Sequence, residues 1–577
     1  MTNTNTLDTL ATVEQSIRLV EAGCEYVRIT APGMKEAENL AKIKKELHAR
    51  GFDVPLIADI HFNPAVAETA AKIVEKIRIN PGNYVDKKKF GKIDFTESEY
   101  QEEIDKIRER ISPLIKICQD YGTAMRIGTN HGSLSDRILS RYGDTPQGMV
   151  QSAMEFISVC EDLGYENLVL SMKASNLRIM VEAYRLLVHT MMNKGMDYPL
   201  HVGVTEAGSG EEGRIKSAAG IGALLEDGIG DTIRVSLTEL PEEEIPVAQL
   251  LAGRYTKRNY HGVAKNIEKS PINPFEFHRH FAPGIGNIGK GSDPVVIISS
   301  ENVGQTSRAD YFFLKNINAL PGRSGSTGVI LAGYSSKTEE NLFPLFNANN
   351  YFRIKKKSTD KNFVLVSSTG LTPSFIEKIK NDNSVVLVIE TFELHAAAAL
   401  RKMIFDLISA HCKCPVIIRR KYENISEEEF KIYASTDIGL LMADGLGDGI
   451  WLEAEDITTE NIERISFNIL QATGARIYKT EFISCPTCGR TSYNILETLE
   501  RVKQFTGHLK GLKIAIMGCV VNGPGEMADA DYGYVGSTEG KINLYKGKHL
   551  VQRNIDEKDA LDSLINLIKE NDDWVDE

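Results

Sequence analysis

The sequence predicts an α/β protein whose first domain is a barrel of alternating strands and helices. Short apolar runs alternate with stretches of helical length from residue 12 to about residue 252. This alternation is typical of a parallel sheet with crossover helices. Seven such units follow one another at even spacing, which favours a (β/α)8-type barrel over an open doubly wound sheet. Because a closed barrel of this type has eight strands, we expect its first strand to be missing.

The elements of this domain can be placed in order along the chain. Val13, Ile17 and Val20 have helical spacing, and Gly23 separates them from the first apolar run. The predicted strands are Tyr26–Ile29, Leu56–His61, Ile77–Asn80, Met125–Asn130, Leu168–Lys173, Leu200–Glu206 and Thr232–Leu237. Active sites of barrel enzymes lie at the carboxyl ends of the strands, so polar residues there are candidates for chemistry.

Basic and polar side chains gather at these strand ends. At or near the ends lie Arg28, His61, Asn80, Asn130, Lys173, Glu206 and Ser236, and slightly earlier in their strands lie Arg78, Arg126 and Arg234. For any one residue, a structural ion pair inside the barrel is an alternative interpretation. Several basic strand ends in a chain with a formal charge of −12 instead favour a site for a phosphate or diphosphate, which needs several converging donors.

Composition excludes several classes of protein. Hydrophobic residues make up 42% of the 577 residues and charged residues 25%, as in ordinary globular proteins. The charge of −12 argues against a general nucleic-acid binder, which needs a basic face. No apolar run approaches the roughly 20 residues that span a bilayer, and the polar N-terminus carries no export signal. Eight cysteines are too few for a disulfide framework in so long a chain, so a cytoplasmic protein is expected.

A glycine-rich segment in the middle of the chain resembles nucleotide-binding loops. Gly284–Lys290 has the glycine spacing of dinucleotide-binding and phosphate-binding loops. Both of those motifs require a strand before the loop and a helix after it. Here no strand precedes the segment, and the apolar run Val295–Ile298 follows it. We therefore reject both motifs.

The middle region repeats part of the first domain. Leu224–Arg234 matches Leu441–Trp451 at an offset of 217 (441 − 224), and Leu168–Leu177 matches Val385–Leu394 at the same offset. Two separate segments that share one offset indicate a duplicated, degenerate barrel-like domain. The counterparts of Lys173, Glu206 and Arg234 are Glu390, Tyr422 and Trp451. Because the polar chemistry is replaced there, we expect this domain to be structural.

The sharpest motif lies near the C-terminus. Cys485 and Cys488 form a CxxC pair, and Cys519 follows the predicted strand Lys513–Met517. A Gly-Pro-Gly turn then allows Glu526 to point back toward the thiols. Thiolates suit an iron–sulfur cluster or zinc, and the spacing alone leaves both open. A structural zinc site usually has Cys or His as its fourth ligand, whereas a carboxylate is the kind of replaceable ligand that a catalytic cluster needs.

Nine segments, in order, together resemble the family of 4-hydroxy-3-methylbut-2-en-1-yl diphosphate synthases. They are VRITAP (27–32), LIADIHF (56–62), RINPGN (78–83), RIGTNHGSL (126–134), KASN (173–176), VTEAG (204–208), EDGIGDTIRVSL (226–237), SCPTCGR (484–490) and GCVVNGPGE (518–526). The matches span the first domain and the C-terminal region. The middle region resembles the insertion that distinguishes the long, three-domain form of the family.

The resemblance implies an iron–sulfur oxidoreductase of the non-mevalonate isoprenoid pathway. Its substrate would be 2-C-methyl-D-erythritol 2,4-cyclodiphosphate, reduced by two electrons from ferredoxin or flavodoxin with loss of a hydroxyl as water. A [4Fe–4S] cluster would be held by Cys485, Cys488, Cys519 and a replaceable Glu526, and Glu206 would be the proton donor. The positions implied for substrate binding are Arg28, His61, Arg78, Asn80, Arg126, Asn130, Lys173, Arg234 and Ser236.

Together these features predict three domains. Residues 1–260 would form the catalytic barrel, 261–478 the inserted barrel-like domain and 479–577 an α+β iron–sulfur domain. We expect a functional monomer, rather than a homodimer, with a hinge near residues 476–484. Two alternatives from other classes remain: a zinc-stabilised binding protein for an anionic metabolite, and a siroheme-type reductase, for which the four expected thiolates are lacking.

The missing strand is expected at the start of the chain. The family that the sequence resembles has a strand before the match to Met1–Thr4, where the methionine is internal. Absence of that strand would leave the edges of Tyr26–Ile29 and Thr232–Leu237 unpaired. We therefore expect a gap in the first barrel beside these two strands.

Overall fold

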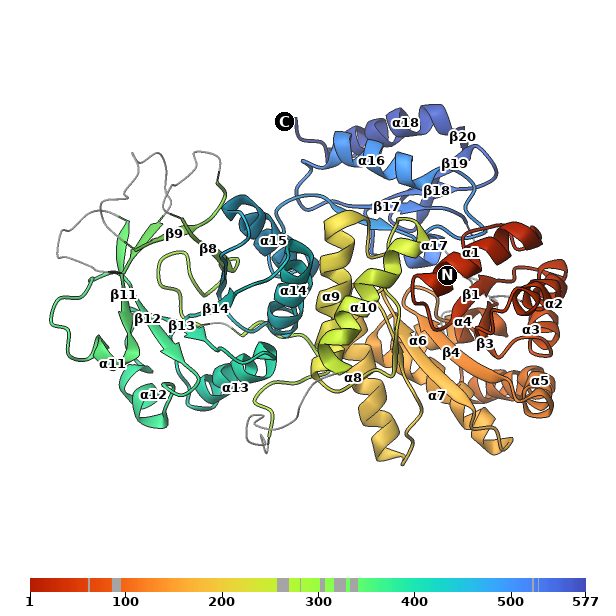
Figure 1. The fold of residues 1–577 in the computed structure, drawn as a ribbon, viewed down its shortest axis with the longest axis horizontal. Coiled ribbons are helices and arrows are strands. Elements are labelled where there is room, and N and C mark those ends of the chain that lie inside the picture. Colours follow the sequence, from red (N-terminus) through yellow and green to blue (C-terminus); the bar gives the residue numbers. More distant parts are fainter. Residues whose placement is uncertain are drawn as a thin grey trace. The chain divides into compact units, whose positions relative to one another are not determined.

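The computed structural model describes residues 1–60, 63–85, 95–256, 269–280, 282–300, 307–315, 328–332, 341–520, 523–527 and 529–576 (Figure 1). The chain divides into two compact units. One unit comprises Met1–Ser217, Gly228–Ala252 and Lys479–Glu577, and the other comprises Ala218–Asp227 and Gly253–Tyr478. The first barrel and the C-terminal domain thus belong to the same unit. Among the described helices, none is long and apolar enough to cross a membrane.

The first domain alternates parallel strands with helices, as the sequence predicts. Its described strands are β1 (Val27–Thr30), β2 (Leu56–Asp59), β3 (Lys76–Ile79), β4 (Ala124–Asn130), β5 (Leu168–Lys173), β6 (His201–Val202) and β7 (Thr232–Ile233). β1 to β5 pair in that order, and β6 pairs with β7. A parallel bridge between Leu170 and Leu200 links the two sheets. The predicted strands are confirmed, although the last two are much shorter than expected.

Helices connect these strands. They are α1 (Thr9–Glu21), α2 (Met34–Ala49), α3 (Pro64–Ala70), α4 (Pro81–Tyr84), α5 (Glu97–Tyr121), α6 (Asp136–Tyr142), α7 (Pro146–Asp162), α8 (Leu177–Asn193), α9 (Gly210–Glu226) and α10 (Glu244–Thr256), with a 3₁₀ turn at Pro241–Glu243. The longest of these helices, α5, begins at a capping box between Thr96 and Glu99. Gly122 follows its last residue and ends the helix with a left-handed φ of 69°.

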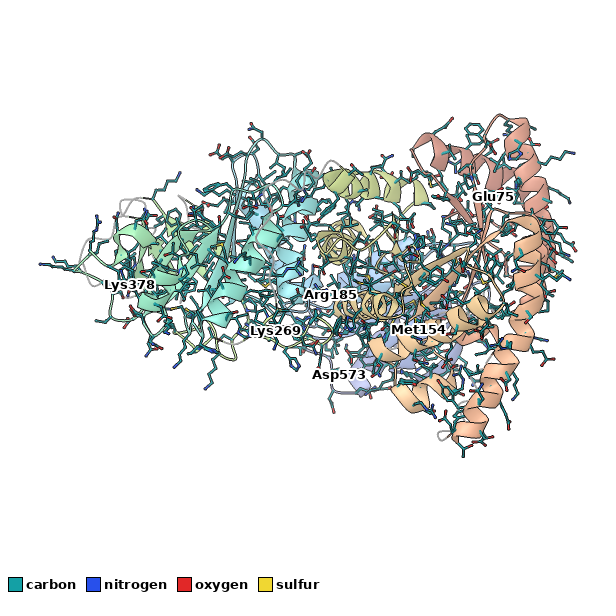
Figure 2. The ribbon with its side chains drawn as sticks, turned by 90° about the horizontal axis from the view of Figure 1, so that it is seen from below. Glu75, Met154, Arg185, Lys269, Lys378 and Asp573 are labelled. Carbon is teal, nitrogen blue, oxygen red and sulfur yellow. The ribbon has the colours of Figure 1, made fainter. Side chains whose placement is uncertain are left out.

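Two hydrogen bonds lie at the amino end and at the β1 edge of the first sheet. At the amino end, Glu75 (Figure 2) precedes β3, and its carboxylate accepts a hydrogen bond of 2.8 Å from the Leu56 N–H. At the edge of β1, the Thr2 N–H donates to the Arg28 carbonyl at 3.0 Å. In the described residues β1 and β7 make no pairing with each other, as the count of seven strands predicted.

The second unit contains a closed barrel of eight parallel strands. They are β8 (Val295–Ser299), β9 (Tyr311–Leu314), β10 (Gly328–Leu331), β11 (Leu342–Asn347), β12 (Asn362–Ser367), β13 (Val385–Glu390), β14 (Val416–Tyr422) and β15 (Gly449–Ala454). They pair in sequence order, and β15 closes on β8. The helices are α11 (Ala348–Tyr351), α12 (Pro373–Ile379), α13 (Ala396–Ser409), α14 (Glu427–Ala443) and α15 (Thr459–Ala472). The described part of this barrel is thus more regular than the predicted degenerate domain.

The glycine-rich segment before β8 forms a turn that packs into this barrel. The Ile285 N–H donates to the Ile288 carbonyl at 2.9 Å, and both isoleucine side chains are buried in the barrel core. Gly286 and Gly289 have φ values of 62° and 91°, a conformation that glycine adopts without strain. The segment is therefore part of the core, in agreement with our rejection of a nucleotide-binding loop.

The internal repeat extends to whole elements. α9 starts at Gly210 and α14 at Glu427, and the two helices end at Glu226 and Ala443, so both ends differ by 217 (427 − 210 and 443 − 226). β5 and β13 also differ by 217 at their first residues (385 − 168). The offset found in the sequence therefore relates corresponding strands and helices.

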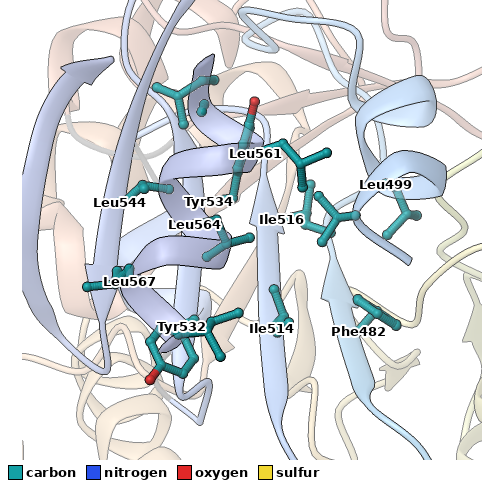
Figure 3. Close-up of a cluster of buried hydrophobic side chains, with 14 of the residues drawn as sticks. Phe482, Leu499, Ile514, Ile516, Tyr532, Tyr534, Leu544, Leu561, Leu564 and Leu567 are labelled. Atoms are coloured by element: carbon teal, nitrogen blue, oxygen red, sulfur yellow. The ribbon is translucent and has the colours of Figure 1, made fainter. Parts of the chain in front are cut away.

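The C-terminal domain is a five-stranded mixed sheet with helices on one face. Its elements are β16 (Glu481–Ser484), α16 (Ile495–Thr506), β17 (Lys513–Met517), α17 (Gly523–Glu526), β18 (Tyr532–Gly536), β19 (Lys541–Lys546), β20 (His549–Asp556) and α18 (Glu557–Glu570). Figure 3 shows Ile514 and Ile516 of β17 with Leu564 of α18 in a core cluster. The alternate residues Ala515 and Met517 pack on the other face, as expected for a strand buried on both sides.

Phe363 offers a test of the second barrel. Its fully buried ring packs against Tyr311 and Phe343, with ring centroids 5.6 and 6.4 Å away. Phe363→Ala should lower the free energy of unfolding by about 3–5 kcal/mol, because it removes a large buried side chain and leaves a cavity. The measurement is denaturant unfolding followed by tryptophan fluorescence, since one of the two tryptophans, Trp451, lies in this core.

The matched control is Phe392→Ala, since Phe392 is 76% exposed in the same unit. That change should alter the stability by no more than about 0.5 kcal/mol. Equal losses in the two variants would contradict the assignment of Phe363 to the core.

Candidate active site

A cavity in the first unit brings together residues from the barrel and from the C-terminal domain. Most of the predicted site residues line it: Arg28, Arg78, Arg126, Asn130, Lys173, Glu206, Arg234, Cys485, Cys488, Cys519 and Glu526. The barrel residues come from the strands β1, β3, β4 and β5 or from the segments that follow β6 and β7. The cysteines and Glu526 follow β16 and β17, whose carboxyl ends face the same cavity.

The remaining predicted residues lie elsewhere or cannot be placed. His61 lies outside the described residues. Asn80 is buried, and its side-chain oxygen caps α4 by accepting from the Gly82 N–H at 3.2 Å. Ser236 is also buried, and its hydroxyl has no hydrogen-bond partner among the described residues. Neither Asn80 nor Ser236 lines the cavity as the structure describes it.

The wall formed by the barrel carries a surplus of positive charge. In the described part of the chain, neither Arg126 nor Lys173 has a carboxylate within ion-pair distance, and Arg126 donates to the Ser171 hydroxyl at 2.8 Å. Burial, followed by the charge of Arg126, lowers the pKa of Lys173 well below its ordinary value. Burial also lowers the pKa of Arg28 to about 10. Such a group of desolvated cations favours the binding of an anion.

Two glutamates face each other across the cavity. Burial raises the pKa of Glu206 well above its ordinary value, and the charge of Glu526 raises it further. Burial also raises the pKa of Glu526. Asn130 orients Glu526 by donating to its Oε1 at 3.0 Å, and Arg78 in turn donates to the Asn130 side-chain oxygen at 3.1 Å. One of the two carboxyl groups is therefore expected to hold a proton at neutral pH.

The backbone at Glu206 is strained. Its φ of 49° lies in the left-handed region, which residues other than glycine seldom adopt. Glu206 lies four residues beyond the end of β6, and its side chain lines the cavity. Strain of this kind is concentrated at functional sites.

The cysteine segments are held by backbone hydrogen bonds. The Gly518 N–H donates to Cys485 Sγ at 3.1 Å, and the Thr491 N–H donates to the Cys488 carbonyl at 2.9 Å. Burial and the neighbouring Cys488 and Cys519 raise the pKa of the Cys485 thiol. Loss of its proton would therefore require positive charge, such as a metal centre, beside it.

The donor set at this end of the cavity consists of three thiols and one carboxyl group. In the described ranges, no three His, Cys, Asp or Glu side chains gather closely enough to bind one metal ion. Thiolates are soft donors that suit iron–sulfur centres or zinc. The predicted Gly-Pro-Gly turn forms the one-turn helix α17, with Glu526 as its last residue.

Several residues of this site were not predicted. Asp59 lies at the end of β2 and pairs with Arg490 at 3.2 Å. His131 lies between Asp144, at 3.5 Å, and Asp529, at 3.8 Å, and so connects the barrel to the segment after Glu526. In the sequence, Asp59, His131 and Arg490 stand out only because they lie inside the nine motifs, close to residues with assigned roles.

Contacts outside the cavity also join the barrel to the C-terminal domain. Ala207 and Ser484 form a parallel bridge, and Thr238 Oγ1 lies 2.6 Å from Ser484 Oγ. Lys216 forms an ion pair of 3.0 Å with Glu481. Both halves of the site therefore come from one chain.

Comparisons with known proteins identify the family of this chain. The GcpE TIM-barrel domain matches residues 1–249, and the GcpE protein C-terminal domain matches residues 481–570. The 4-hydroxy-3-methylbut-2-en-1-yl diphosphate synthase (flavodoxin) of Parabacteroides distasonis is 48% identical, over 100% of this chain and 95% of that protein. The chloroplastic, ferredoxin-type synthase of Arabidopsis thaliana is 42% identical, over 100% of this chain and 85% of that protein. The chain therefore belongs to the GcpE family, that of the 4-hydroxy-3-methylbut-2-en-1-yl diphosphate synthases.

Proposed function

We propose that this chain reduces 2-C-methyl-D-erythritol 2,4-cyclodiphosphate to 4-hydroxy-3-methylbut-2-enyl diphosphate in the non-mevalonate isoprenoid pathway. The observation that carries the proposal is one cavity in which buried barrel cations face three cysteines and two glutamates. The names of the relatives also support an oxidoreductase of this kind, with flavodoxin or ferredoxin as electron donor. They give no support to the zinc-stabilised binding protein.

The barrel cations would bind the diphosphate of the substrate. Arg126 and Lys173 are buried without a carboxylate partner among the described residues, so phosphate oxygens would replace the hydration that they lack. Arg28, Arg78 and Arg234 line the same cavity and supply further donors. Planar guanidinium groups bind phosphate oxygens in pairs, which would also orient the ring to be opened.

Cys485, Cys488, Cys519 and Glu526 would hold the [4Fe–4S] cluster. When bound, the cluster would supply electrons and a Lewis-acidic iron to the substrate. The Gly518 N–H stabilises negative charge on the Cys485 sulfur. Asn130 holds Glu526 in the cavity while leaving one of its carboxylate oxygens for another contact.

Glu206 would donate the proton that the departing hydroxyl needs. Burial raises its pKa, which favours the protonated form that a general acid needs. Loss of that proton to the hydroxyl releases water and leaves a carboxylate in the cationic cavity. The strained backbone points the side chain toward the cavity.

We assign three functional domains, with the barrel at residues 1–260, the inserted barrel at 261–478 and the iron–sulfur domain at 479–577. The contacts of Ala207, Lys216 and Thr238 with the C-terminal domain support closure of the site within one chain. This closure supports our proposal of a functional monomer.

Loss of one thiol should have a larger effect on the cluster than loss of the carboxylate. Cys519→Ala should abolish the cluster, since two thiolates and one carboxylate remain. Glu526→Ala should retain part of the iron while losing most activity, because three thiolates still hold the cluster. Iron and sulfide analysis of anaerobically purified protein measures both. Equal loss of iron in the two variants would contradict the role of Glu526 as the replaceable ligand.

Glu206→Gln should lower kcat by about a hundredfold or more, the usual scale for general acid catalysis. Because glutamine has nearly the same shape, the iron content and KM should change little. The measurement is anaerobic turnover of the cyclodiphosphate with a chemical reductant. Activity within a few-fold of the unmodified enzyme would remove Glu206 from the reaction.

Mixing two inactive variants tests whether one chain makes the whole site. A Glu206→Gln chain and a Cys519→Ala chain, combined in equal amounts, should stay inactive, because each chain closes its own defective site. Recovery of up to about a quarter of the activity, as statistical exchange between two subunits would give, would show that the site is shared between chains.

A further inference from the structure

One carboxylate in the cavity has three arginines around it. Asp59 is the last residue of β2 and is only 3% exposed. Its Oδ1 lies 3.3 Å from Arg78 Nη1, and its Oδ2 lies 3.2 Å from Arg490 Nη2. Arg28 Nη2 lies 3.8 Å from the same Oδ2. Asp59 therefore neutralises a large part of the positive charge on this side of the cavity.

The three arginines come from different parts of the chain. Arg28 and Arg78 belong to β1 and β3, the strands on either side of β2. Arg490 follows Cys488 by two residues, in the loop that carries two of the proposed cluster ligands. The Asp59–Arg490 pair thus connects the barrel directly to that loop. Because both side chains are largely buried, loss of either partner would leave an uncompensated charge.

A diphosphate would compete with Asp59 for the same guanidinium groups. Phosphate oxygens bind arginine with the same paired geometry as a carboxylate and bring more negative charge. Arg126 and Lys173 differ from these arginines, because in the described residues they have no carboxylate to displace. An arriving anion could bind these two cations first and then the arginines held by Asp59.

We propose that Asp59 is a positioning residue that holds Arg28, Arg78 and the loop of Arg490 in place until the substrate diphosphate replaces it. The inference rests on the proposed function, since it requires a diphosphate in this cavity. It assigns Asp59 two opposite effects. Its charge weakens the binding of anions, and its ion pair with Arg490 orders the cluster-bearing loop.

These two effects separate a positioning role from a structural one. Asp59→Asn removes the competing negative charge, so anions should bind more tightly. It also weakens the ion pair with Arg490, so the loop that carries Arg490 should become more mobile. A residue needed only for folding would weaken both properties when replaced. The control is Asp310→Asn, because Asp310 belongs to the other unit, pairs with Arg476 at 2.5 Å and does not line the cavity.

The experiment uses the cluster-containing enzyme under anaerobic conditions. Calorimetric titration with inorganic pyrophosphate should give a Kd about tenfold lower for Asp59→Asn than for the unmodified enzyme, the scale of one removed charge at close range. Hydrogen exchange of residues 485–490 should become at least several-fold faster. Asp310→Asn should change neither. Arg490→Gln should speed exchange in the loop but weaken pyrophosphate binding.

The outcomes distinguish this inference from the function on which it rests. If pyrophosphate fails to bind the unmodified enzyme, the proposed diphosphate site is wrong, and the role of Asp59 with it. If the unmodified enzyme binds but Asp59→Asn binds equally or more weakly, only the competition is refuted. If hydrogen exchange of residues 485–490 is unchanged in both Asp59→Asn and Arg490→Gln, the ion pair between the barrel and the loop does not order the loop, and that part of the inference is refuted. If Asp59→Asn does not fold, Arg490→Gln still decides that point.

Discussion

Buried positive charge is the constraint on which the first unit depends. Six cationic side chains line its cavity: Arg28, Arg78, Arg126, Lys173, Arg234 and Arg490. Withdrawing each from water costs several kcal/mol unless an opposite charge compensates it. Asp59 compensates three of them, and Glu244 pairs with Arg234 at 3.2 Å. Among the described residues Arg126 and Lys173 have no carboxylate partner, and in our proposal they attract the anionic substrate.

In the described part of the second barrel, an arginine at the strand ends is balanced by carboxylates. At the end of β13, Glu390 lies 3.4 Å from Arg419, and Glu453 lies 2.7 Å from the same guanidinium. Trp451 covers that group, with its ring centroid 4.1 Å away. Its indole N–H also donates to Ser299 at 2.9 Å. A cation with two carboxylates leaves no net positive charge to attract an anion, which explains in physical terms why this repeat is expected to be structural.

The sequence predicts strands well because apolar runs report burial directly. β5 and β17 have the predicted bounds, since both runs (LVLSMK and KIAIM) consist mostly of apolar residues. β6 ends at Val202, before the predicted end at Glu206, and the left-handed φ of Glu206 has no apolar signature in the sequence. The cysteines and most strand-end cations of the site could also be predicted, because each of them belongs to a pattern formed by residues that are neighbours in the sequence.

Pairings between distant residues were not predictable from local patterns. Asp59 and Arg490 are 431 positions apart, and nothing near either residue identifies the other. His131 and Asp529 also come from different domains, and each lies beside a residue with a stronger motif. Their roles follow from the closure of the C-terminal domain over the barrel, which depends on packing. One sequence shows the two surfaces but not that they meet.

The left-handed backbone of Glu206 lowers the stability of the folded chain, while the same residue supplies a carboxyl group to the cavity. A side chain in that region costs about 1–2 kcal/mol relative to an ordinary conformation, and glycine would avoid the cost. The folded chain would therefore be more stable with glycine at position 206, yet it would have no carboxyl group in the cavity. At this position the chain thus has lower stability in exchange for a carboxyl group in the cavity.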